Sequence, residues 1–589
     1  MLFVDQIKRS HRCGELRLTH EGKTVVLMGW VHRVRDLGGR IFVTLRDVTG
    51  AVQLRFDADS ETRLESARQL RAEWVVGVEG RVVGRGENVN RDMATGEIEV
   101  LVDRMEVLAT SDPPPFPVEE EVDAHEETRL RYRYIDLRRP PLQRRILARS
   151  LANRVTRDYL LRHHFIEIET PILLKSTPEG ARDYLVPSRV QPGTFFALPQ
   201  SPQTLKQILM ISGFDRYFQI ARCFRDEDLR ADRQPEFTQV DLEMSFICED
   251  DIIELVEGLV VELVRALDGR EVKRPFPRLS FQKAMSLYGT DRPDLRFPMA
   301  MEDLGSVFAA STFQVFSSAL AEGGVIKGIC MPGGAGKSRK DIDALTAEVA
   351  RFGAKGLLWF KRELEEFKGP AVKFLTELEL KALDRQFSPV SGDLVLVLAG
   401  PRRVVEPALG HLRTLLGPEA FPGTLGELRL LWVERFPMFE HDPETGALHA
   451  MHHPFTQPAP EDIERLESDP MSVRARAYDV VLNGVELGGG SIRMHHREMQ
   501  ERVFKALGLD AAAAQEKFGF LLDALRFGAP PHGGLALGMD RVVMMLTGGS
   551  SIRDVIAFPK TTRAADLMTG SPSVVDEAQL RELHLQIRE

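Results

Sequence analysis

Cysteines and long hydrophobic runs are scarce in this sequence. Its four cysteines, Cys13, Cys223, Cys248 and Cys330, are far apart and form no CxxC pair, which argues against a disulfide framework and against a structural zinc site. No apolar run approaches the roughly 20 residues that span a bilayer, and the N-terminus has no apolar stretch followed by a small-residue cleavage site. We therefore expect a cytoplasmic protein that does not associate with membranes.

Positive charge is also in deficit. Lys and Arg number 77 against 87 Asp and Glu, a net charge of −10, whereas a generic nucleic-acid binder is basic overall. A local basic face stays open, because residues 28–56 carry five arginines and two aspartates. The 589 residues, 43% hydrophobic and 28% charged, suit a globular enzyme of about three or four domains.

Strand-like and helix-like runs divide the chain. Residues 24–57 and 73–108 combine strand-like composition with glycine-rich connectors, which predicts a small barrel, the OB type being one option. Residues 110–125 are proline-rich and then acidic, a linker composition. A helix is expected from about Pro141, and its apolar residues at four-residue spacing should form a buried stripe: Leu147, Leu151, Val155 and Tyr159.

A second helix is predicted over 250–267, and further strands over 428–434 and 478–493. The octet MPGGAGKS at 331–338 resembles the end of a phosphate-binding loop. A Walker A loop would need glycine at 331, and that residue is Met331. We interpret the octet as a glycine turn that opens a helix in an inserted module.

The most informative stretch is 217–246. Its second half alternates strictly, with Val240, Leu242 and Met244 on one face and polar residues on the other, as in a strand with one apolar face. The first half alternates alike, so a hairpin with a charged loop over 226–236 is predicted. A solvated outer face is the ordinary interpretation of its polar residues, which are Arg225, Glu227, Gln239, Asp241 and Glu243.

Two other segments favour a binding site over a solvated face, because they too combine acids with an arginine. DVVLNGVELGGGSIRM (479–494) places Asp479 and Glu486 near a glycine cluster, followed by Arg493. GGLALGMDR (533–541) predicts a strand or turn before a helix that starts near Met539, with Arg541 in its first turn. Arginines bind phosphate oxygens through forked hydrogen bonds, and carboxylates hold Mg²⁺ against such oxygens or bind an ammonium group.

These segments resemble the three motifs of the class II aminoacyl-tRNA synthetases, subclass b. Residues 163–176 are similar to motif 1, 224–243 to motif 2 and 534–541 to motif 3. The runs TPEGARDY, QSPQTLKQ, MHHPFT and GVELGGGSIR resemble the bacterial-type aspartyl-tRNA synthetase family. The resemblance covers essentially the whole chain.

The resemblance implies an α+β multidomain fold and an aspartate–tRNA ligase. The fold would combine an OB-fold β-barrel, a class II core on an antiparallel β-sheet flanked by helices, and an inserted α+β domain of the GAD type. The expected domains are an anticodon-binding domain (1–108), a hinge (109–140), a first segment of the catalytic core (141–284), the inserted domain (285–420), and a second segment of the core with a C-terminal extension (421–589).

The family's reaction joins aspartate to ATP as aspartyl-adenylate and then transfers it to tRNA. By resemblance, Arg225 and Arg541 are the catalytic residues, because they would neutralise phosphate charge. Mg²⁺ would bind Asp479 and Glu486. The residues implied in ATP binding are Arg225, Asp226, Glu227, Gln234, Glu486, Gly538, Met539, Asp540 and Arg541.

The resemblance also implies an L-aspartate site. Glu179, Gln203 and Asp241 would hold the ammonium group. Arg225 would touch the α-carboxylate, and Lys206 and Arg493 would hold the side-chain carboxylate, with His452 closing over it. Two cations facing that carboxylate should reject asparagine, since sites of this kind discriminate by about 10⁴–10⁵.

The barrel would bind the anticodon, with Phe42 stacking on a base and Arg33, Gln53 and Glu99 reading base edges. The implied partners are tRNA(Asp), L-aspartate, ATP and a second copy of the chain; whether tRNA(Asn) is also charged stays open.

The alternative functions are an ammonia-dependent asparagine synthetase, a non-catalytic OB-fold binding protein, and an asparaginyl-tRNA or lysyl-tRNA synthetase. The barrel argues against the first, and the intact arginines and acids against the second. The Lys206–Arg493 pairing and the inserted domain argue against an asparaginyl-tRNA or lysyl-tRNA synthetase.

Overall fold

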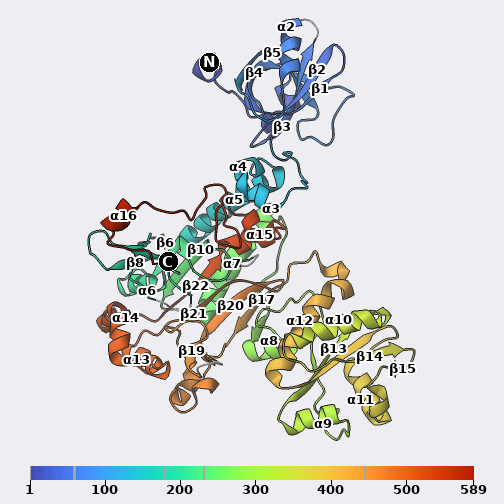
Figure 1. Cartoon of the computed structure of the whole chain (residues 1–589), viewed down its shortest axis with the longest axis vertical. Coiled ribbons are helices and arrows are strands. Elements are labelled where there is room, and N and C mark those ends of the chain that lie inside the picture. The colour runs from blue at the N-terminus through green and yellow to red at the C-terminus, as the bar shows by residue number, and fades with distance from the viewer. Residues whose placement is uncertain (1, 58–60, 178–180, 230–231, 443–445, 589) are drawn as a thin grey trace. The chain divides into compact units, whose positions relative to one another are not determined.

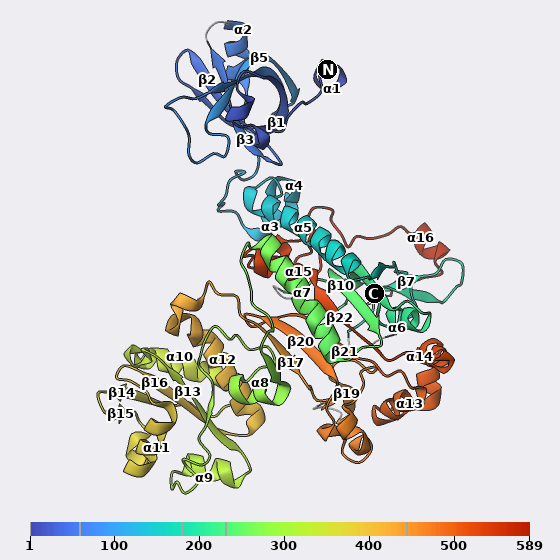
Figure 2. The same cartoon turned by 180° about the vertical axis from the view of Figure 1, so that it is seen from behind.

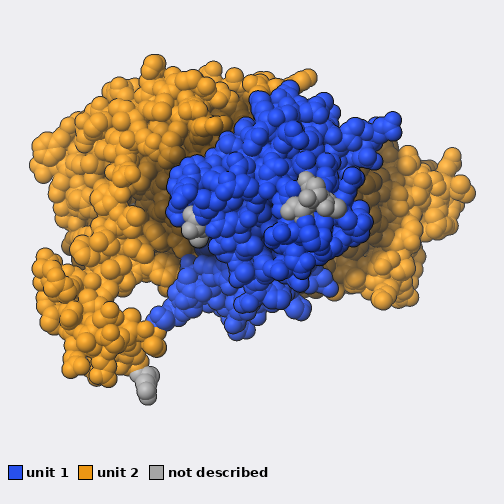
Figure 3. All heavy atoms as spheres, turned by 90° about the horizontal axis from the view of Figure 1, so that it is seen from above, with its two compact units in different colours: residues 1–147, 553–573 blue, residues 148–552, 574–589 orange. Residues whose placement is uncertain are grey.

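The computed structural model describes residues 2–57, 61–177, 181–229, 232–442 and 446–588. The chain forms two compact units (Figure 3). Unit 1 comprises residues 1–147 and 553–573, and unit 2 comprises 148–552 and 574–589. The sequence did not anticipate that residues 553–573 join the N-terminal unit. The finer domain boundaries at 108, 140, 284 and 420 stay predictions.

Unit 1 contains the predicted barrel. Its five strands close in the order β1-β2-β3-β5-β4 (Figure 1), and alternate apolar side chains such as Leu27, Val43 and Leu54 fill the interior without exposure. Period-two alternation therefore builds the core here as the sequence predicts. The strands are β1 (Thr24–Asp36), β2 (Arg40–Asp47), β3 (Gly50–Asp57), β4 (Val75–Gly84) and β5 (Ile98–Ala109), and the helices of this region are α1 (Leu2–Asp5) and α2 (Glu61–Gln69).

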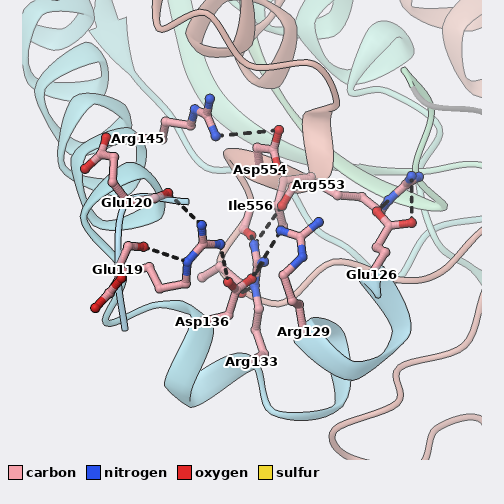
Figure 4. Close-up of polar contacts among 12 residues, drawn as sticks. Glu119, Glu120, Glu126, Arg129, Arg133, Asp136, Arg145, Arg553, Asp554 and Ile556 are labelled. Atoms are coloured by element: carbon pink, nitrogen blue, oxygen red, sulfur yellow. Dashed lines mark hydrogen bonds and ion pairs between the residues drawn. The ribbon is translucent and has the colours of Figure 1, made fainter. Parts of the chain in front are cut away.

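The predicted hinge, 109–140, contains two short helices, α3 (Glu126–Arg131) and α4 (Arg133–Asp136), around a buried carboxylate (Figure 4). Asp136 is fully buried and accepts hydrogen bonds from Arg133 and Arg139, each at 2.9 Å. Arg133 also donates to the carbonyl oxygens of Arg553 and Ile556. A buried charge needs such partners, and these contacts explain why the 553–573 segment belongs to unit 1.

Unit 2 is built on an eight-stranded sheet in the order β11-β17-β20-β21-β22-β10-β9-β6 (Figure 1). The central pairs are antiparallel, and the two edge pairs, β11–β17 and β6–β9, are parallel. The strands are β6 (Ile166–Glu167), β9 (Arg216–Phe224), β10 (Glu236–Ser245), β11 (Arg278–Ser280), β17 (Leu430–Glu434), β20 (Ala477–Leu482), β21 (Val485–Ile492) and β22 (His532–Gly538).

Helix α7 (Glu249–Leu267) matches the helix predicted over 250–267 and lies along the sheet (Figure 2). The predicted helix from Pro141 is α5 (Pro140–Arg162). Its predicted buried stripe is wrong: Tyr159 is buried, but Leu147 is 48% exposed. The helix instead buries Leu142, Ala152 and Leu160, so the four-residue spacing identified the helix but not its covered face.

The segment predicted as an inserted domain, 285–420, contains a separate five-stranded sheet, in the order β12-β13-β16-β14-β15. The glycine octet follows β13, and Ser338 caps helix α10 through a hydrogen bond from Asp341 N. The octet is therefore a turn before a helix, as predicted. The elements are β12 (Glu302–Asp303), α9 (Gln314–Ala321), β13 (Val325–Met331), α10 (Arg339–Ala350), β14 (Leu358–Glu363), β15 (Glu366–Lys368), α11 (Glu377–Phe387), β16 (Leu394–Gly400) and α12 (Arg402–Ala420).

Two small hairpins and several helices complete unit 2. None of the helices in the region of the chain that the structure describes is long and apolar enough to cross a membrane. The remaining elements are β7 (Leu185–Pro187), β8 (Phe195–Ala197), α6 (Gln203–Ile211), α8 (Phe281–Tyr288), β18 (Phe439–His441), β19 (Leu448–Ala450), α13 (Arg497–Ala506), α14 (Ala511–Ala524), α15 (Met539–Leu546) and α16 (Glu577–Glu582).

Candidate active site

A cavity of about 470 Å³ opens over the large sheet of unit 2. Its lining comes from segments far apart in the sequence: α6, β10, β20, β21, β22 and the start of α15. The predicted site residues that line it are Gln203, Lys206, Arg225, Glu227, Gln234, Asp241, His452, Asp479, Glu486, Arg493, Gly538, Asp540 and Arg541. The polar face of the hairpin is thus the wall of a cavity and not a solvated outer face.

At one end of this cavity, two cations and two carboxylates form a buried network. Lys206 Nζ donates to Asp241 Oδ2 at 2.8 Å and lies 3.2 Å from Glu243 Oε2. Arg493 Nε donates to Glu243 Oε1 at 3.0 Å, and its Nη1 donates to Ser491 Oγ at 2.6 Å. All four charged side chains are at most 4% exposed. Such a network keeps its charges only because each has a partner.

Glycine makes room for this network. A Cβ at Gly534 on β22 would lie 1.9 Å from Glu243 Oε2, so a side chain there would displace the carboxylate. Glu243 can therefore lie flat on the neighbouring strand, between Lys206 and Arg493. The glycine-rich strand of the third motif thus positions charge as well as backbone.

Three buried polar atoms beside the network have no hydrogen-bond partner among the described residues: Gln203 Nε2, Asp241 Oδ1 and His452 Nε2. Their residues line the cavity. Burial, with a smaller effect of the Arg493 charge, lowers the pKa of His452 to about 4, so its ring is neutral at pH 7. Unsatisfied buried groups of this kind are costly, and a bound ligand would satisfy them.

The other end of the cavity has positive groups with few partners. The Arg225 guanidinium lies over the Phe237 ring at 5.1 Å and makes no hydrogen bond or ion pair with the residues that the structure describes. Arg541 Nη1 donates to the backbone oxygen of Glu486 at 3.1 Å, and its Nη2 lies 3.4 Å from Asp232 Oδ2. Their guanidinium forks can therefore take an oxyanion.

Acidic residues lie at the same end. Asp479 is 9% exposed, and burial together with the charges of Glu486 and Asp291 raises its pKa well above the ordinary value. All three line the cavity. A Cβ at Gly489 would lie 2.1 Å from Asp479 Oδ1, so glycine is needed beside this carboxylate. No group of three or more ligating side chains in the described ranges is arranged to hold a metal directly.

The remaining predicted residues lie at the margins. Asp540 lines the cavity, but its carboxylate accepts from Thr238 N at 2.9 Å and pairs with Arg149. Met539 is buried and Asp226 pairs with Arg182 at 3.6 Å; neither lines the cavity. Glu227 pairs with Arg233 at 3.1 Å. Glu179 lies outside the described residues.

In unit 1, the predicted anticodon residues lie on the barrel's outer face. Phe42 is half-buried, opposite Arg35 of β1 and Arg55 of β3 in the strand register. Gln53 and Glu99 are buried and joined by a 2.8 Å hydrogen bond. Arg33 is exposed and 3.9 Å from Glu119. An aromatic ring among arginines suits a nucleobase.

Sequence reasoning gave no role to Glu243, which lies in the buried network beside the cavity, or to Asp291, which lines the cavity. Glu243 is on the polar face of the predicted hairpin, but nothing in the strand periodicity shows that it joins Lys206 to Arg493. Asp291 lies just after the predicted boundary at 284, and no sequence signal connects it to the carboxylates of β20 and β21.

A family model described as tRNA synthetases class II (D, K and N) matches residues 125–562, and one described as OB-fold nucleic acid binding domain matches residues 25–108. The chain belongs to the class II tRNA synthetases of the D, K and N group.

Among its curated relatives are two full-length proteins whose names specify aspartate. It is 50% identical to "Aspartate--tRNA(Asp/Asn) ligase" of Thermoanaerobacter pseudethanolicus, over 99% of both chains. It is 52% identical to "Aspartate--tRNA ligase" of Geobacillus kaustophilus, also over 99% of both.

Solved structures agree on the fold. Asparaginyl-tRNA synthetase from Pyrococcus horikoshii, complexed with asparaginyl-adenylate, matches with a TM-score of 0.59 at 20% identity, covering 94% of this chain and 98% of that one. A putative aspartyl-tRNA synthetase from Leishmania major matches with a TM-score of 0.58 at 19% identity, covering 94% of each chain. At this identity the likeness shows the fold alone.

Proposed function

We propose that the protein activates L-aspartate with ATP and transfers the aspartyl group to the 3′-terminal adenosine of tRNA(Asp). The observation that carries this proposal is the buried network of Lys206, Asp241, Glu243 and Arg493 beside the open arginines. The full-length relatives named as aspartate ligases support the same substrate. A translation enzyme of this kind works in the cytoplasm, where its tRNA is.

Aspartate fits the buried end by charge. Its ammonium group can donate to Asp241 Oδ1, which has no hydrogen-bond partner among the described residues and lines the same cavity as Gln203. Its side-chain carboxylate can accept from Lys206 and Arg493, and His452 can donate from a neutral ring. Asparagine would present an NH₂ group to these donors, and buried donors facing donors reject an analogue strongly.

Activation needs positioning and charge stabilisation rather than a protein nucleophile. An oxygen of the aspartate α-carboxylate attacks the α-phosphorus, and pyrophosphate leaves. Arg225 would stabilise the charge on the α-phosphate and Arg541 the charge on the γ-phosphate, with Glu227 and Gln234 beside the adenine. In the second step, a ribose hydroxyl of the tRNA attacks the carbonyl carbon and AMP leaves.

The acidic wall fits a magnesium ion. Asp479 and Glu486 would hold it, since their mutual repulsion, visible in the raised pKa of Asp479, is relieved by a cation. When bound with ATP, Mg²⁺ neutralises phosphate charge and orients the triphosphate. The protein's own contribution is to keep the two carboxylates on adjacent strands, β20 and β21.

The barrel is the proposed anticodon site. Phe42 offers the stacking surface, and Arg33 can reach the RNA backbone or a base edge. Gln53 and Glu99 would read a base only with some of their hydrogen-bonding capacity, since they already bond to each other. Because several relatives carry the name "Aspartate--tRNA(Asp/Asn) ligase", we also propose tRNA(Asn) as a substrate.

A homodimer belongs to the proposal. Residues at the end of α5 and just beyond it expose large apolar side chains: Leu161 at 53%, Ile166 at 48%, Ile172 at 47% and Leu173 at 50%. Ile166 is in β6, an edge strand of the sheet. Exposed apolar patches and unpaired edges mark interfaces, and light scattering of the purified protein would give the mass of two chains.

Charging assays test this function. Purified protein with ATP and labelled aspartate should charge tRNA(Asp) and tRNA(Asn), and should exchange pyrophosphate into ATP only when aspartate is present. An ammonia-dependent asparagine synthetase would instead form free asparagine without tRNA. Formation of asparagine, or failure to charge tRNA(Asp) while ATP is bound, would contradict the proposal.

A further inference from the structure

The wall that carries Asp479 and Glu486 has a third carboxylate, and it comes from the inserted domain. Asp291 follows helix α8 and lines the same cavity as Arg541 and the two acids of β20 and β21. We propose that Asp291 is a further residue of the Mg²⁺–ATP site, where it holds water bound to the cation. This inference rests on the proposed function and gives the inserted domain a role in the reaction.

The inserted domain fixes the chain just after Asp291. Arg413 of α12 is 1% exposed and lies over the Tyr288 ring at 4.7 Å. Its guanidinium donates to the backbone oxygens of Asp294, at 2.6 Å, and of Met299, at 2.9 Å. A buried arginine with its donors on backbone oxygens holds the 294–299 segment at a set position on α12.

The catalytic sheet fixes the same segment from the other side. Gly484, with φ of +83°, forms the turn between β20 and β21, and a Cβ there would lie 3.3 Å from the Cβ of Asp294. The turn therefore packs closely on the segment. Because Asp479 and Glu486 belong to the two strands joined by this turn, Asp291 and both acids share one rigid frame.

The three carboxylates are short of partners. Within the described ranges, the only hydrogen bond to the Asp291 carboxylate comes from Thr290 Oγ1, at 3.4 Å. The Asp479 carboxylate, nine-tenths buried, has no hydrogen bond or ion pair among the same residues. Arg541 Nη1, 3.6 Å from Glu486 Oε2, is the nearby cation. An added divalent cation would balance this excess of negative charge.

Water must complete the link. The described side chains form no direct three-ligand metal cage, so Asp291 cannot be a third direct ligand beside Asp479 and Glu486 in this geometry. Mg²⁺ keeps several waters when it binds through one or two carboxylates plus phosphates. Residues that orient such outer groups affect metal affinity by about 10–100-fold.

The variant D291N tests the proposal in the full-length protein. Its dissociation constant for Mn²⁺, measured by electron paramagnetic resonance with a non-hydrolysable ATP analogue present, should rise about tenfold, at the low end for outer groups. D291E should restore most of the affinity. D343N is the matched control, because Asp343 is exposed on α10 of the same domain and outside the cavity; it should bind Mn²⁺ as the wild type does. Equal Mn²⁺ affinity in D291N and wild type would overturn the proposal.

Two further measurements separate a metal role from a structural one. Without metal, D291N should melt at or above the wild-type temperature, because a repelling charge is removed. In pyrophosphate exchange, its KM for Mg²⁺ should rise while its KM for aspartate stays unchanged. A lower melting temperature together with a raised aspartate KM would overturn the proposal in favour of a packing role. Failure of the proposed function looks different: wild type would lack aspartate-dependent exchange, whatever the Mn²⁺ affinities.

Discussion

The two ends of the cavity treat charge in opposite ways. At the buried end, Lys206, Glu243 and Arg493 are paired with one another or with Asp241 at 2.8–3.2 Å. At the open end, Arg225 has only an aromatic ring beneath it, and Asp479 has no partner among the described residues. At the buried end the four charged side chains are paired before any ligand arrives, whereas at the open end a ligand would supply the missing partners.

This difference separates selectivity from chemistry. A paired network holds the donors for a small dicarboxylic amino acid in one geometry, so discrimination is built into the folded chain. The open end keeps its arginines and acids free for a triphosphate and a cation, where stabilisation of developing charge gives rate. Breaking the first end should therefore damage fold and function together, and breaking the second should damage function alone.

The largest effect is expected for R493L. It removes a donor to the substrate carboxylate and leaves Glu243, in a fully buried site, with Lys206 as its only ion-pair partner among the residues that the structure describes. Aspartate-dependent pyrophosphate exchange should fall by at least about 10³-fold, and the free energy of unfolding by about 3–5 kcal/mol. Denaturant unfolding and exchange assays measure both.

The double variant E243Q/R493L is the control for misfolding. Neutralising Glu243 should recover some of the lost stability without recovering exchange. Near-normal exchange in R493L would remove Arg493 from the aspartate site.

R541A should give the next largest effect, and a different pattern. Its guanidinium donates one hydrogen bond to the backbone oxygen of Glu486, at 3.1 Å, and lies 3.4 Å from the Asp232 and 3.6 Å from the Glu486 carboxylate. These contacts are partly exposed, so the melting temperature should change little. The value of kcat/KM for ATP should fall by about 10²–10³-fold, as for loss of a group that stabilises transition-state charge. If R541A lost as much stability as R493L, it would contradict the claim that changes at the open end damage function alone.

F42A leaves both ends of the cavity intact. Base stacking on an aromatic ring contributes about 1–3 kcal/mol, so kcat/KM for tRNA should fall by roughly 5–150-fold. Pyrophosphate exchange without tRNA should stay at the wild-type rate. If charging and exchange fall equally, Phe42 supports the fold of the barrel rather than the anticodon.

D479N should have a smaller effect on stability than R493L, and the opposite sign. The pKa of Asp479 is raised in the folded protein, so its ionisation makes folding less favourable as the pH rises above the unfolded-state pKa of about 3.9. Neutralising it should stabilise the metal-free protein by about 0.5–2 kcal/mol at pH 8, with a smaller gain at pH 5. Thermal melts at both pH values, and a loss of exchange, check this prediction.

Local pattern and recognisable motifs accounted for the frame of the molecule. Strict alternation after Gln239 identified β10, and glycine before Met539 identified the start of α15. The barrel followed from short runs of β-branched residues between turns. These features are local, so a single sequence contains them.

What the sequence could not supply was long-range pairing. The four-residue spacing correctly predicted the helix α5, but it predicted the wrong buried face. Nothing in the described chain buries Leu147, which belongs to the predicted stripe. Glu243 was visible as a polar strand residue, yet its place between Lys206 and Arg493 depends on three separate segments. Asp291 lies beside a segment that packs on Arg413 and Gly484, and no local period encodes this packing.

Amino-acid-dependent pyrophosphate exchange by the wild-type protein tests the central claim most directly. With ATP and Mg²⁺ present, L-aspartate should support exchange, and L-asparagine and L-lysine should be at least about 10³-fold poorer in kcat/KM, as expected of a site whose buried donors face a carboxylate. Exchange with asparagine as efficient as with aspartate would show that the paired network of Lys206, Asp241, Glu243 and Arg493 does not select the substrate.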